Sequence, residues 1–267
     1  IPKDRFTAMT RLDENRAKAQ LGEQETPKPD AAPLPVRMRT DLGNAERLID
    51  RHGEDLRHVP GWGLLAWDGR RWARDLSRGV VRRAKKTVRS IYREAENEPD
   101  PDRRKELAKH AAASEAAPRI AAMIELAKSD ARIQAKTEDF DRDPMLLNVA
   151  NGTIDLKSGA RRSQRREDYC TKLVPVEYDP DAKAPRWERF LEEITDGRPE
   201  LAAFLQRAVG YSATGHVKER VVVICWGGGK NGKSVFLRTI AQALGEYAHQ
   251  AEPQLLLARR NADGPRN

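Results

Sequence analysis

A glycine-rich octet near the C-terminal end places the strictest requirement on how this chain folds. It runs from Gly227 to Ser234 within VVVICWGGGKNGKSVFLRTI and fits the pattern G-x-x-x-x-G-K-[ST] without departure. Glycines allow successive backbone N–H groups to converge on phosphate oxygens, because no Cβ interferes, and the start of the following helix adds unpaired donors. The octet therefore predicts a phosphate-binding loop between a strand and a helix.

The residues on either side of the octet agree with this prediction. Arg220 to Cys225 form an apolar run typical of a buried strand, and Ser234 to Leu244 carry apolar side chains at helical spacing. A strand, a loop and a helix in this order predict the start of an α/β P-loop ATPase core that is AAA+-like. The alternative is a glycine-rich turn that precedes Lys-Ser by chance.

The octet also predicts roles for individual residues toward ATP and Mg²⁺. Lys233 is expected to reach the β- and γ-phosphates, where it offsets charge that builds during transfer, and is the predicted catalytic residue. The Ser234 hydroxyl is the predicted metal ligand, and Lys230 is expected only to assist. The predicted nucleotide-binding residues are Gly227, Gly228, Gly229, Lys230, Asn231, Gly232, Lys233 and Ser234.

Hydrolysis requires acidic side chains in addition to the loop, typically at the end of a second buried strand. The acids that follow the octet are Glu246, Glu252 and Asp263, and none of them ends an apolar strand. The nearest candidate strand, 255–258, continues into two arginines, whose charge is wrong for a metal ligand. We therefore expect a truncated core that binds Mg-nucleotide weakly and hydrolyses little or none of it.

Composition and charge limit the class of protein. The 267 residues carry a formal net charge of +8, and 34 % of them are charged. No apolar run approaches the roughly 20 residues that cross a bilayer, and the first residues show no apolar region of a secretory signal. Cys170 and Cys225 lie far apart and are predicted to be small buried side chains. We expect a cytoplasmic protein with a polyanionic partner and no membrane contact.

The N-terminal part predicts a linker followed by folded structure. Residues 1–40 read as an arm and a proline-rich linker, with a helix over 13–21. Folded structure is expected to begin with a helix that Thr40 or Asp41 caps and Gly53 ends. Its predicted apolar face consists of Leu42, Ala45, Leu48 and Ile49.

A β-hairpin is predicted next. The pair Asp68-Gly69 lies between short runs that carry Trp67 and Trp72, and glycine accepts the positive φ of a tight turn. The aromatic side chains, including Trp62, are expected to pack in a core. A platform on which nucleic acid bases stack is the alternative.

A helix predicted from Asp75 to about Glu98 has an apolar face and a basic face. The apolar face consists of Val81, Ala84, Val88, Ile91, Tyr92 and Ala95. The basic face consists of Arg78, Arg82, Lys85, Lys86, Arg89 and Arg93. A second basic cluster consists of Arg161, Arg162, Arg165 and Arg166. Both groups are candidates for contact with DNA phosphates, and a solvated surface balanced by Glu94, Glu96 and Glu98 is the alternative.

The remaining segments predict more helices and a second β region. Helices are expected over 102–114, 117–130, 187–197 and 198–215. A β region is expected over 146–162, with tight turns at Asn151-Gly152 and Ser158-Gly159, and a strand over 170–178. The alternating acids Asp139, Asp141 and Asp143 are expected to form a turn, because no Gly-x₅-Glu follows to complete a cation loop.

Several segments together resemble a known family. They are TDLGNAERLIDRHGEDLRHVPGWG, AWDGRRW, FDRDPMLLNVANGTIDLKSG, REDYCTKLVPVEYDP, FLQRAVGYSATG and WGGGKNGKSVFL. In this order they resemble the phage- and plasmid-encoded primase-helicases, which join a poxvirus-primase-like N-terminal region to a superfamily III helicase. The resemblance covers residues 41 to 267.

The resemblance implies a domain order and a function. It implies a primase-like α+β domain at 41–180, a helical segment for oligomerisation at 181–218, and the start of the helicase P-loop domain at 219–267. It further implies an ATP-dependent DNA helicase of phage or plasmid replication, in the cytoplasm of a bacterial host. DNA, single-stranded, forked or at an origin duplex, would be the partner.

The resemblance also implies an assembly. Subunits would form a homo-oligomeric ring, a hexamer, with ATP between neighbours and a primase domain upstream. The family's acidic strand, sensor and arginine finger are expected beyond Asn267. The alternative is a DNA-binding assembly or loader module that uses ATP as an ordering ligand. A P-loop kinase for a small substrate is a third reading, which leaves the large basic upstream region without a purpose.

Overall fold

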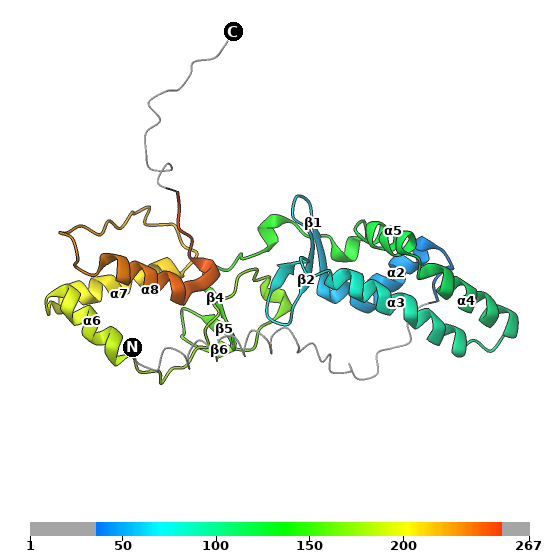
Figure 1. Ribbon diagram of the computed structural model, residues 1–267, viewed down its shortest axis with the longest axis horizontal. Helices are drawn as coiled ribbons and strands as arrows, with labels where there is room; N and C mark the ends of the chain where they lie inside the picture. Colours follow the sequence, from blue (N-terminus) through cyan, green and yellow to red (C-terminus); the bar gives the residue numbers. More distant parts are fainter. Residues whose placement is uncertain (1–35, 253–267) are drawn as a thin grey trace, which may run out of the picture. The chain divides into compact units, whose positions relative to one another are not determined.

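Helices and two small antiparallel sheets make up the part of the chain that the computed structural model describes, residues 36–252 (Figure 1). The described residues from Arg37 onward belong to one structural unit. The fold is therefore mixed α/β, as expected for the N-terminal region. Most of the predicted arm with its helix over 13–21, and the candidate strand over 255–258, lie outside the described residues.

Within the described chain, one helix precedes the first sheet in the sequence and three helices follow it before the second sheet. They are α2 (Asp41–His52), α3 (Gly79–Glu96), α4 (Pro101–Ser114) and α5 (Ala117–Ala127). The start of α2 confirms the predicted cap, because the Thr40 hydroxyl accepts a hydrogen bond of 3.0 Å from the Gly43 amide. Gly53 ends this helix as predicted. The prediction that Leu42 belongs to the apolar face is wrong, since its side chain is 58 % exposed.

One apolar core joins α2, α3 and α5. Leu48, Val88 and Met123 each contribute a fully buried side chain to it, one from each helix. Burying a side chain of this size contributes about 2 kcal/mol. The core therefore holds α3 by its apolar face and leaves the opposite face of that helix to solvent.

Helix α3 begins later than its periodicity predicts. The predicted start was Asp75, but the helix begins at Gly79 because the Asp75 carboxylate accepts hydrogen bonds from the Gly79 and Val80 amides. Arg78, with φ of 57°, lies in the left-handed region and turns the chain into the helix. Asp75 thus acts as a cap from outside the helix rather than as its first residue.

The first sheet confirms the predicted hairpin. It consists of β1 (Leu56–Val59), β2 (Gly63–Trp67) and β3 (Trp72–Arg74) in the order β1-β2-β3. Trp67 pairs with Trp72 across the strands, with ring centroids 5.8 Å apart. Phe140 and Tyr169 complete this aromatic cluster. The cluster confirms core packing, because Trp72 is only 1 % exposed and Trp67 is buried.

The second sheet lies downstream. It consists of β4 (Leu146–Val149), β5 (Gly152–Asp155) and β6 (Arg161–Arg162), and the predicted turn at Asn151-Gly152 joins the first two. The predicted strand over 170–178 is wrong. This segment meets β4 at an isolated bridge between Val149 and Val174, with hydrogen bonds from the Val174 amide to Asn148 O and from the Ala150 amide to Val176 O, which are too few to make a strand.

The alternating aspartates form turns, as predicted. Asp139 accepts a hydrogen bond from the Lys136 amide, and Asp141 and Asp143 accept hydrogen bonds from the amides of Thr171 and Met145. Each carboxylate therefore satisfies a different backbone donor. Within residues 36–252, no group of three or more His, Cys, Asp or Glu side chains is placed to hold a metal ion.

Three helices form the C-terminal part of the described chain. They are α6 (Pro185–Thr195), α7 (Pro199–Ala213) and α8 (Lys233–Leu244), and all three were predicted. Trp187 of α6 stacks on Phe236 of α8 with ring centroids 5.8 Å apart. None of the helices between residues 36 and 252 has the length and apolar character needed to cross a membrane.

A buried polar network links α2 to α4. The His110 ring nitrogen Nε2 lies 2.9 Å from Asn44 Oδ1, and the Asn44 side-chain amide donates to the Ser114 hydroxyl at 2.9 Å. Burial lowers the pKa of His110, and the positive charges of Arg47 and Arg119 act in the same direction. The imidazole is therefore neutral in the folded protein near pH 7.

This network predicts a loss of stability in mild acid. The folded-state pKa of His110 lies below the unfolded value of about 6.5, so its contribution is fully present above that pH and is lost as the pH falls through the folded-state pKa. We expect the unfolding free energy, measured by urea titration, to decrease below pH 6.5. His110→Gln, which cannot titrate, is expected to cost about 1–2 kcal/mol at pH 7 and to flatten this decrease. An unchanged slope in the variant would show that other groups cause it.

Candidate functional site

The glycine-rich loop leads directly into α8, as the octet predicts. Gly232 is the residue before the helix and has φ of 84°, in the left-handed region that favours glycine. A Cβ at Gly232 would lie 2.5 Å from Cγ2 of Ile194. Glycine at this position therefore permits both the turn and the close packing of the loop against α6.

Lys233 is the first residue of α8, and its ammonium group lies within the loop. Its ammonium Nζ donates hydrogen bonds to Gly227 O at 3.0 Å, to Gly228 O at 2.9 Å and to Asn231 Oδ1 at 2.7 Å. The loop therefore wraps around one positive charge and supplies it with three oxygen acceptors. Phosphate oxygens are acceptors of the same kind with more negative charge, so a bound phosphate can replace these partners.

The rest of the octet leaves room for a ligand. No atom lies within 4 Å of a Cβ built at Gly228 or Gly229, so the loop is open at these residues. Ser234 lies in the first turn of α8 with an exposed side chain, where a helix N-terminus presents unpaired N–H donors. Lys230 is exposed, with φ of 60°, and makes no hydrogen bond or ion pair with the residues that the structure describes.

The donors of the loop fit a nucleotide phosphate chain. The Lys233 ammonium and the N–H groups at the start of α8 are the donors that suit it, and the Ser234 side chain is exposed beside them. Mg²⁺ prefers oxygen ligands and usually retains several waters beside one or two carboxylates and substrate phosphates. The octet itself contains no acidic residue, so the Ser234 hydroxyl is the predicted metal ligand that it contributes.

The strand predicted before the loop is not formed. Residues 220–225 belong to no strand, Arg220 has a left-handed φ of 48°, and the Val222 and Ile224 side chains are 80 % and 79 % exposed. An apolar run becomes a buried strand only where neighbouring strands pair with it, and none of the described strands lies beside this one. Because this run is unpaired, Cys225 is only half-buried, which corrects the prediction that its side chain is buried. Cys170 is buried as predicted. The described part of the expected α/β core is therefore a loop and a helix.

The acidic residues after the loop have other roles or lie outside the description. Glu246 forms an ion pair with Arg71 and accepts a hydrogen bond from the Leu173 amide. Glu252 is exposed and Asp263 lies outside the described residues.

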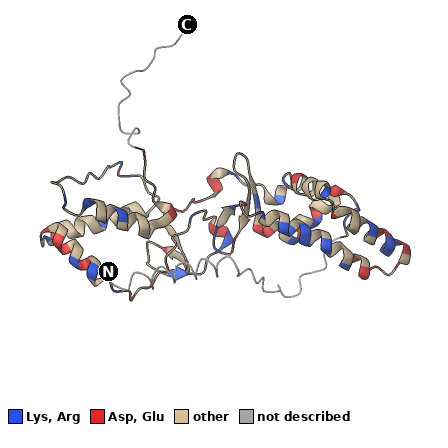
Figure 2. Ribbon diagram, in the orientation of Figure 1, with Lys and Arg blue, Asp and Glu red and all other residues tan. Residues whose placement is uncertain are grey.

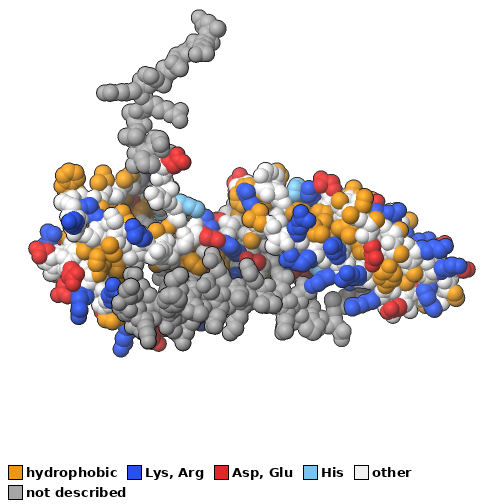
Figure 3. Space-filling view, viewed as in Figure 1, with side chains coloured by type: hydrophobic (Ala, Val, Ile, Leu, Met, Phe, Trp, Pro, Cys, Tyr) orange, Lys and Arg blue, Asp and Glu red, His pale blue; other side chains and the backbone are white. Residues whose placement is uncertain are grey.

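The basic face of α3 is a second candidate site. Figure 2 shows Lys and Arg positions recurring along the ribbon of α3, and Figure 3 shows blue side chains gathered over the same part of the molecule. Arg78, Lys85, Arg89 and Arg93 are exposed and form no ion pair within residues 36–252. Arg82 is exposed and donates only to Ser77.

The neighbouring glutamates differ in their partners. Glu94 accepts hydrogen bonds from Arg47 and Arg51 of α2, and the Glu98 carboxylate accepts one from the Asp100 amide. Of the three glutamates in the alternative prediction, Glu94 is thus engaged by arginines of α2, whereas Glu96 and Glu98 remain near this face without an arginine or lysine partner within residues 36–252. Arg78, Lys85, Arg89 and Arg93 of the basic face therefore present positive charge to solvent, which suits contact with phosphates.

The second basic cluster differs from the α3 face. Arg162 forms a two-point ion pair with Asp168, with both N–O distances 2.6 Å. The hydrogen bonds to Asp168 raise the pKa of Arg162, although burial acts in the opposite direction. Arg166 pairs with Asp55 at 2.6 Å. These two guanidinium groups already have carboxylate partners and therefore stabilise the fold. Arg161 and Arg165 of the same cluster are exposed and form no ion pair within residues 36–252, so they stay candidates for contact with DNA.

One family shows similarity over more than half of the chain. The sequence model described as "D5 N terminal like" matches residues 45–196, and the chain belongs to this family. The match includes both sheets, helix α3 and helix α6, and it ends before the glycine-rich loop.

Two curated proteins are also similar to the chain. "Putative primase C962R" of African swine fever virus (isolate Tick/Malawi/Lil 20-1/1983) is 29 % identical over 136 residues, which cover 48 % of this chain and 14 % of the viral protein. "Uncharacterized protein C22orf15" of Homo sapiens is 36 % identical over 75 residues, which cover 26 % of this chain and 51 % of the human protein. The chain thus spans only part of each relative.

Proposed function

We propose that this chain is part of a primase-helicase-type replication protein that uses ATP to unwind DNA. The observation that carries the proposal is the position of the Lys233 ammonium at the centre of a glycine-rich loop, directly before α8. This position suits contact with the β- and γ-phosphates of ATP. The family match and the similarity to a viral protein named as a primase support a role in DNA replication.

The chain's own residues would act at three places in such a protein. The loop would bind the phosphates, with Lys233 offsetting their charge and Ser234 as a ligand of Mg²⁺. The bound metal would neutralise charge on the phosphates during transfer. The basic face of α3 would hold the DNA backbone, and the subunits would form a ring, a hexamer, in which a neighbour completes the nucleotide site.

ATP hydrolysis with and without single-stranded DNA tests this proposal. We would measure it for the 267-residue chain and for any longer native form of the protein, with Lys233→Ala as the control for the loop. We expect little hydrolysis by the chain itself and DNA-stimulated hydrolysis by a form that contains an acidic strand. Nucleotide binding without DNA-stimulated hydrolysis in every form would contradict a motor and favour an assembly or loader module.

A further inference from the structure

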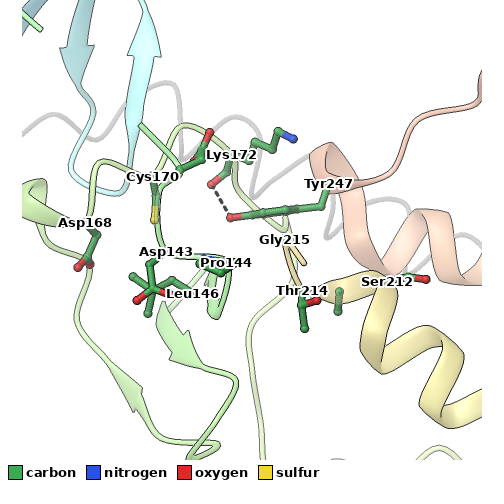
Figure 4. Close-up of a pocket in the computed structure, with 12 residues that line it drawn as sticks. Asp143, Pro144, Leu146, Asp168, Cys170, Lys172, Ser212, Thr214, Gly215 and Tyr247 are labelled. Carbon is green, nitrogen blue, oxygen red and sulfur yellow. Dashed lines mark hydrogen bonds between the residues drawn. The ribbon is translucent and has the colours of Figure 1, made fainter. Parts of the chain in front are cut away.

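The residues that follow α8 dock on the second sheet, far from the loop in sequence. Helix α8 continues into η5 (Gly245–Tyr247), a single helical turn. The Tyr247 hydroxyl accepts a hydrogen bond of 3.2 Å from the Asn148 amide of β4 and donates one of 3.4 Å to Lys172 O. Figure 4 shows the Tyr247 side chain reaching across to Lys172 beside a cavity of about 270 Å³.

Glu246, the residue before Tyr247, makes a second contact with the region that matches the family model, residues 45–196. The Glu246 carboxylate forms an ion pair with Arg71, which lies next to β3 of the first sheet. The same carboxylate accepts a hydrogen bond of 3.1 Å from the Leu173 amide. The two adjacent side chains of η5 therefore hold a residue next to the first sheet and a residue of the second. We call the pair Glu246 and Tyr247 the latch.

The backbone of η5 is shaped for this contact. Gly245 has φ of 53°, and a Cβ built there would lie 2.3 Å from Cδ of Pro175. The close approach thus requires glycine. The Tyr247 ring packs against the apolar cluster of Val149, Ile154 and Val174, and burial raises the pKa of its phenol. The hydroxyl therefore keeps its proton and can donate to a carbonyl while it accepts from an amide.

The end of α8 that carries the loop is held by α6, where Phe236 stacks on Trp187 and Gly232 packs against Ile194. Phe236 is the one buried side chain of α8 in the described structure, and Val235 and Leu237 are more than half exposed, so the latch adds a second support at the other end of the helix. The helix has 12 residues and is about 18 Å long, so the latch and the phosphate loop lie at the two ends of one rigid element. A restraint on one end of such a helix limits the motion of the other.

We propose that Glu246 and Tyr247 are positioning residues that hold α8 so that the phosphate loop is preorganised for a nucleotide. The proposal rests on the proposed nucleotide site. A loop on a restrained helix loses less conformational freedom when it binds, so affinity is higher with the latch docked. By linkage, a bound nucleotide also strengthens the docking by the same factor.

Tyr247→Phe tests this role, because it removes the hydroxyl and keeps the ring in its apolar cluster. We expect the Asn148 amide to exchange its hydrogen about 10-fold faster, since that amide loses its acceptor. We expect the Kd for Mg-ATP to rise about 3- to 10-fold. In the unmodified chain, Mg-ATP is expected to slow exchange at Asn148 and Leu173.

The matched control is Tyr178→Phe. Tyr178 packs in the same apolar cluster, but its hydroxyl makes no hydrogen bond within residues 36–252. The hydrogen bonds of the Tyr247 hydroxyl do not involve Tyr178. The control is expected to retain the Kd and the exchange rate at Asn148.

Each outcome bears on the proposal in a different way. Faster exchange at Asn148 with an unchanged Kd would overturn it, because docking would then be structural only. Unchanged exchange would show that the latch does not dock in solution. If the unmodified chain binds no Mg-ATP, the proposed nucleotide function fails together with the positioning role, and the exchange rates still report whether the latch docks.

Discussion

Lys233→Ala is expected to lower the affinity of the chain for Mg-ATP about 100-fold. Hydrogen bonds to a charged group contribute about 1.5–3 kcal/mol, and the upper end of this range applies to an ammonium surrounded by phosphate oxygens. The loop holds the Lys233 ammonium with three oxygen acceptors, which a nucleotide would replace with phosphates. Equilibrium titration with a fluorescent ATP analogue and Mg²⁺ would measure the Kd.

The control for this variant is Lys230→Ala. It removes the same charge from the same loop, but Lys230 is exposed and makes no hydrogen bond or ion pair with any described residue. We expect its Kd to rise only about 3-fold, since Lys230 is expected only to assist and its exposed charge is screened by salt. Equal losses in the two variants would show that the loop attracts nucleotide through net charge alone. Unchanged affinity in Lys233→Ala would exclude the proposed phosphate contact.

Reversing four charges on α3 is expected to weaken DNA binding about 1,000-fold near 0.1 M salt and to flatten its salt dependence. The variant carries Arg78→Glu, Arg82→Glu, Lys85→Glu and Arg89→Glu, which are exposed positions on the basic face. Each phosphate contact contributes about 0.9 to the slope of log K against log salt, so four lost contacts reduce the slope by roughly 3 to 4. Fluorescence anisotropy at several salt concentrations measures both quantities.

The change in net charge requires a matched control. Four reversals take the formal charge of the chain from +8 to zero, which by itself weakens binding to any polyanion. The control reverses four other exposed cations and has the same final charge: Lys183, Arg186, Arg189 and Lys218. We expect the control to keep most of the salt slope. Equal slopes in the two variants would assign the α3 face to solvent.

Helix α2 and the first hairpin were predictable because their signals are local. Thr40 lies three residues from the Gly43 amide that it caps, and Asp68-Gly69 lies between the two tryptophans that it brings together. Such contacts depend on neighbours a few residues away, so a short stretch of sequence contains all their partners. The burial of Trp72 followed from the same local pattern together with its apolar surface.

The latch and the unpaired run before the loop could not be predicted in this way. Tyr247 contacts Asn148 and Lys172, which are 99 and 75 residues away, and no repeat or motif connects these positions. The run 220–225 has an apolar pattern typical of a strand, but pairing requires a second strand whose position the pattern does not contain.

The two basic groups show the division between sequence and tertiary structure most clearly. Sequence alone established that arginines and lysines recur on one face of α3 and again over 161–166, because helical period and composition are local properties. Only the fold decided which of them are free. It brings Asp168 and Asp55 to the second cluster and directs Glu94 away from α3 toward α2, since the partner of a charge is set by three-dimensional proximity rather than by sequence separation.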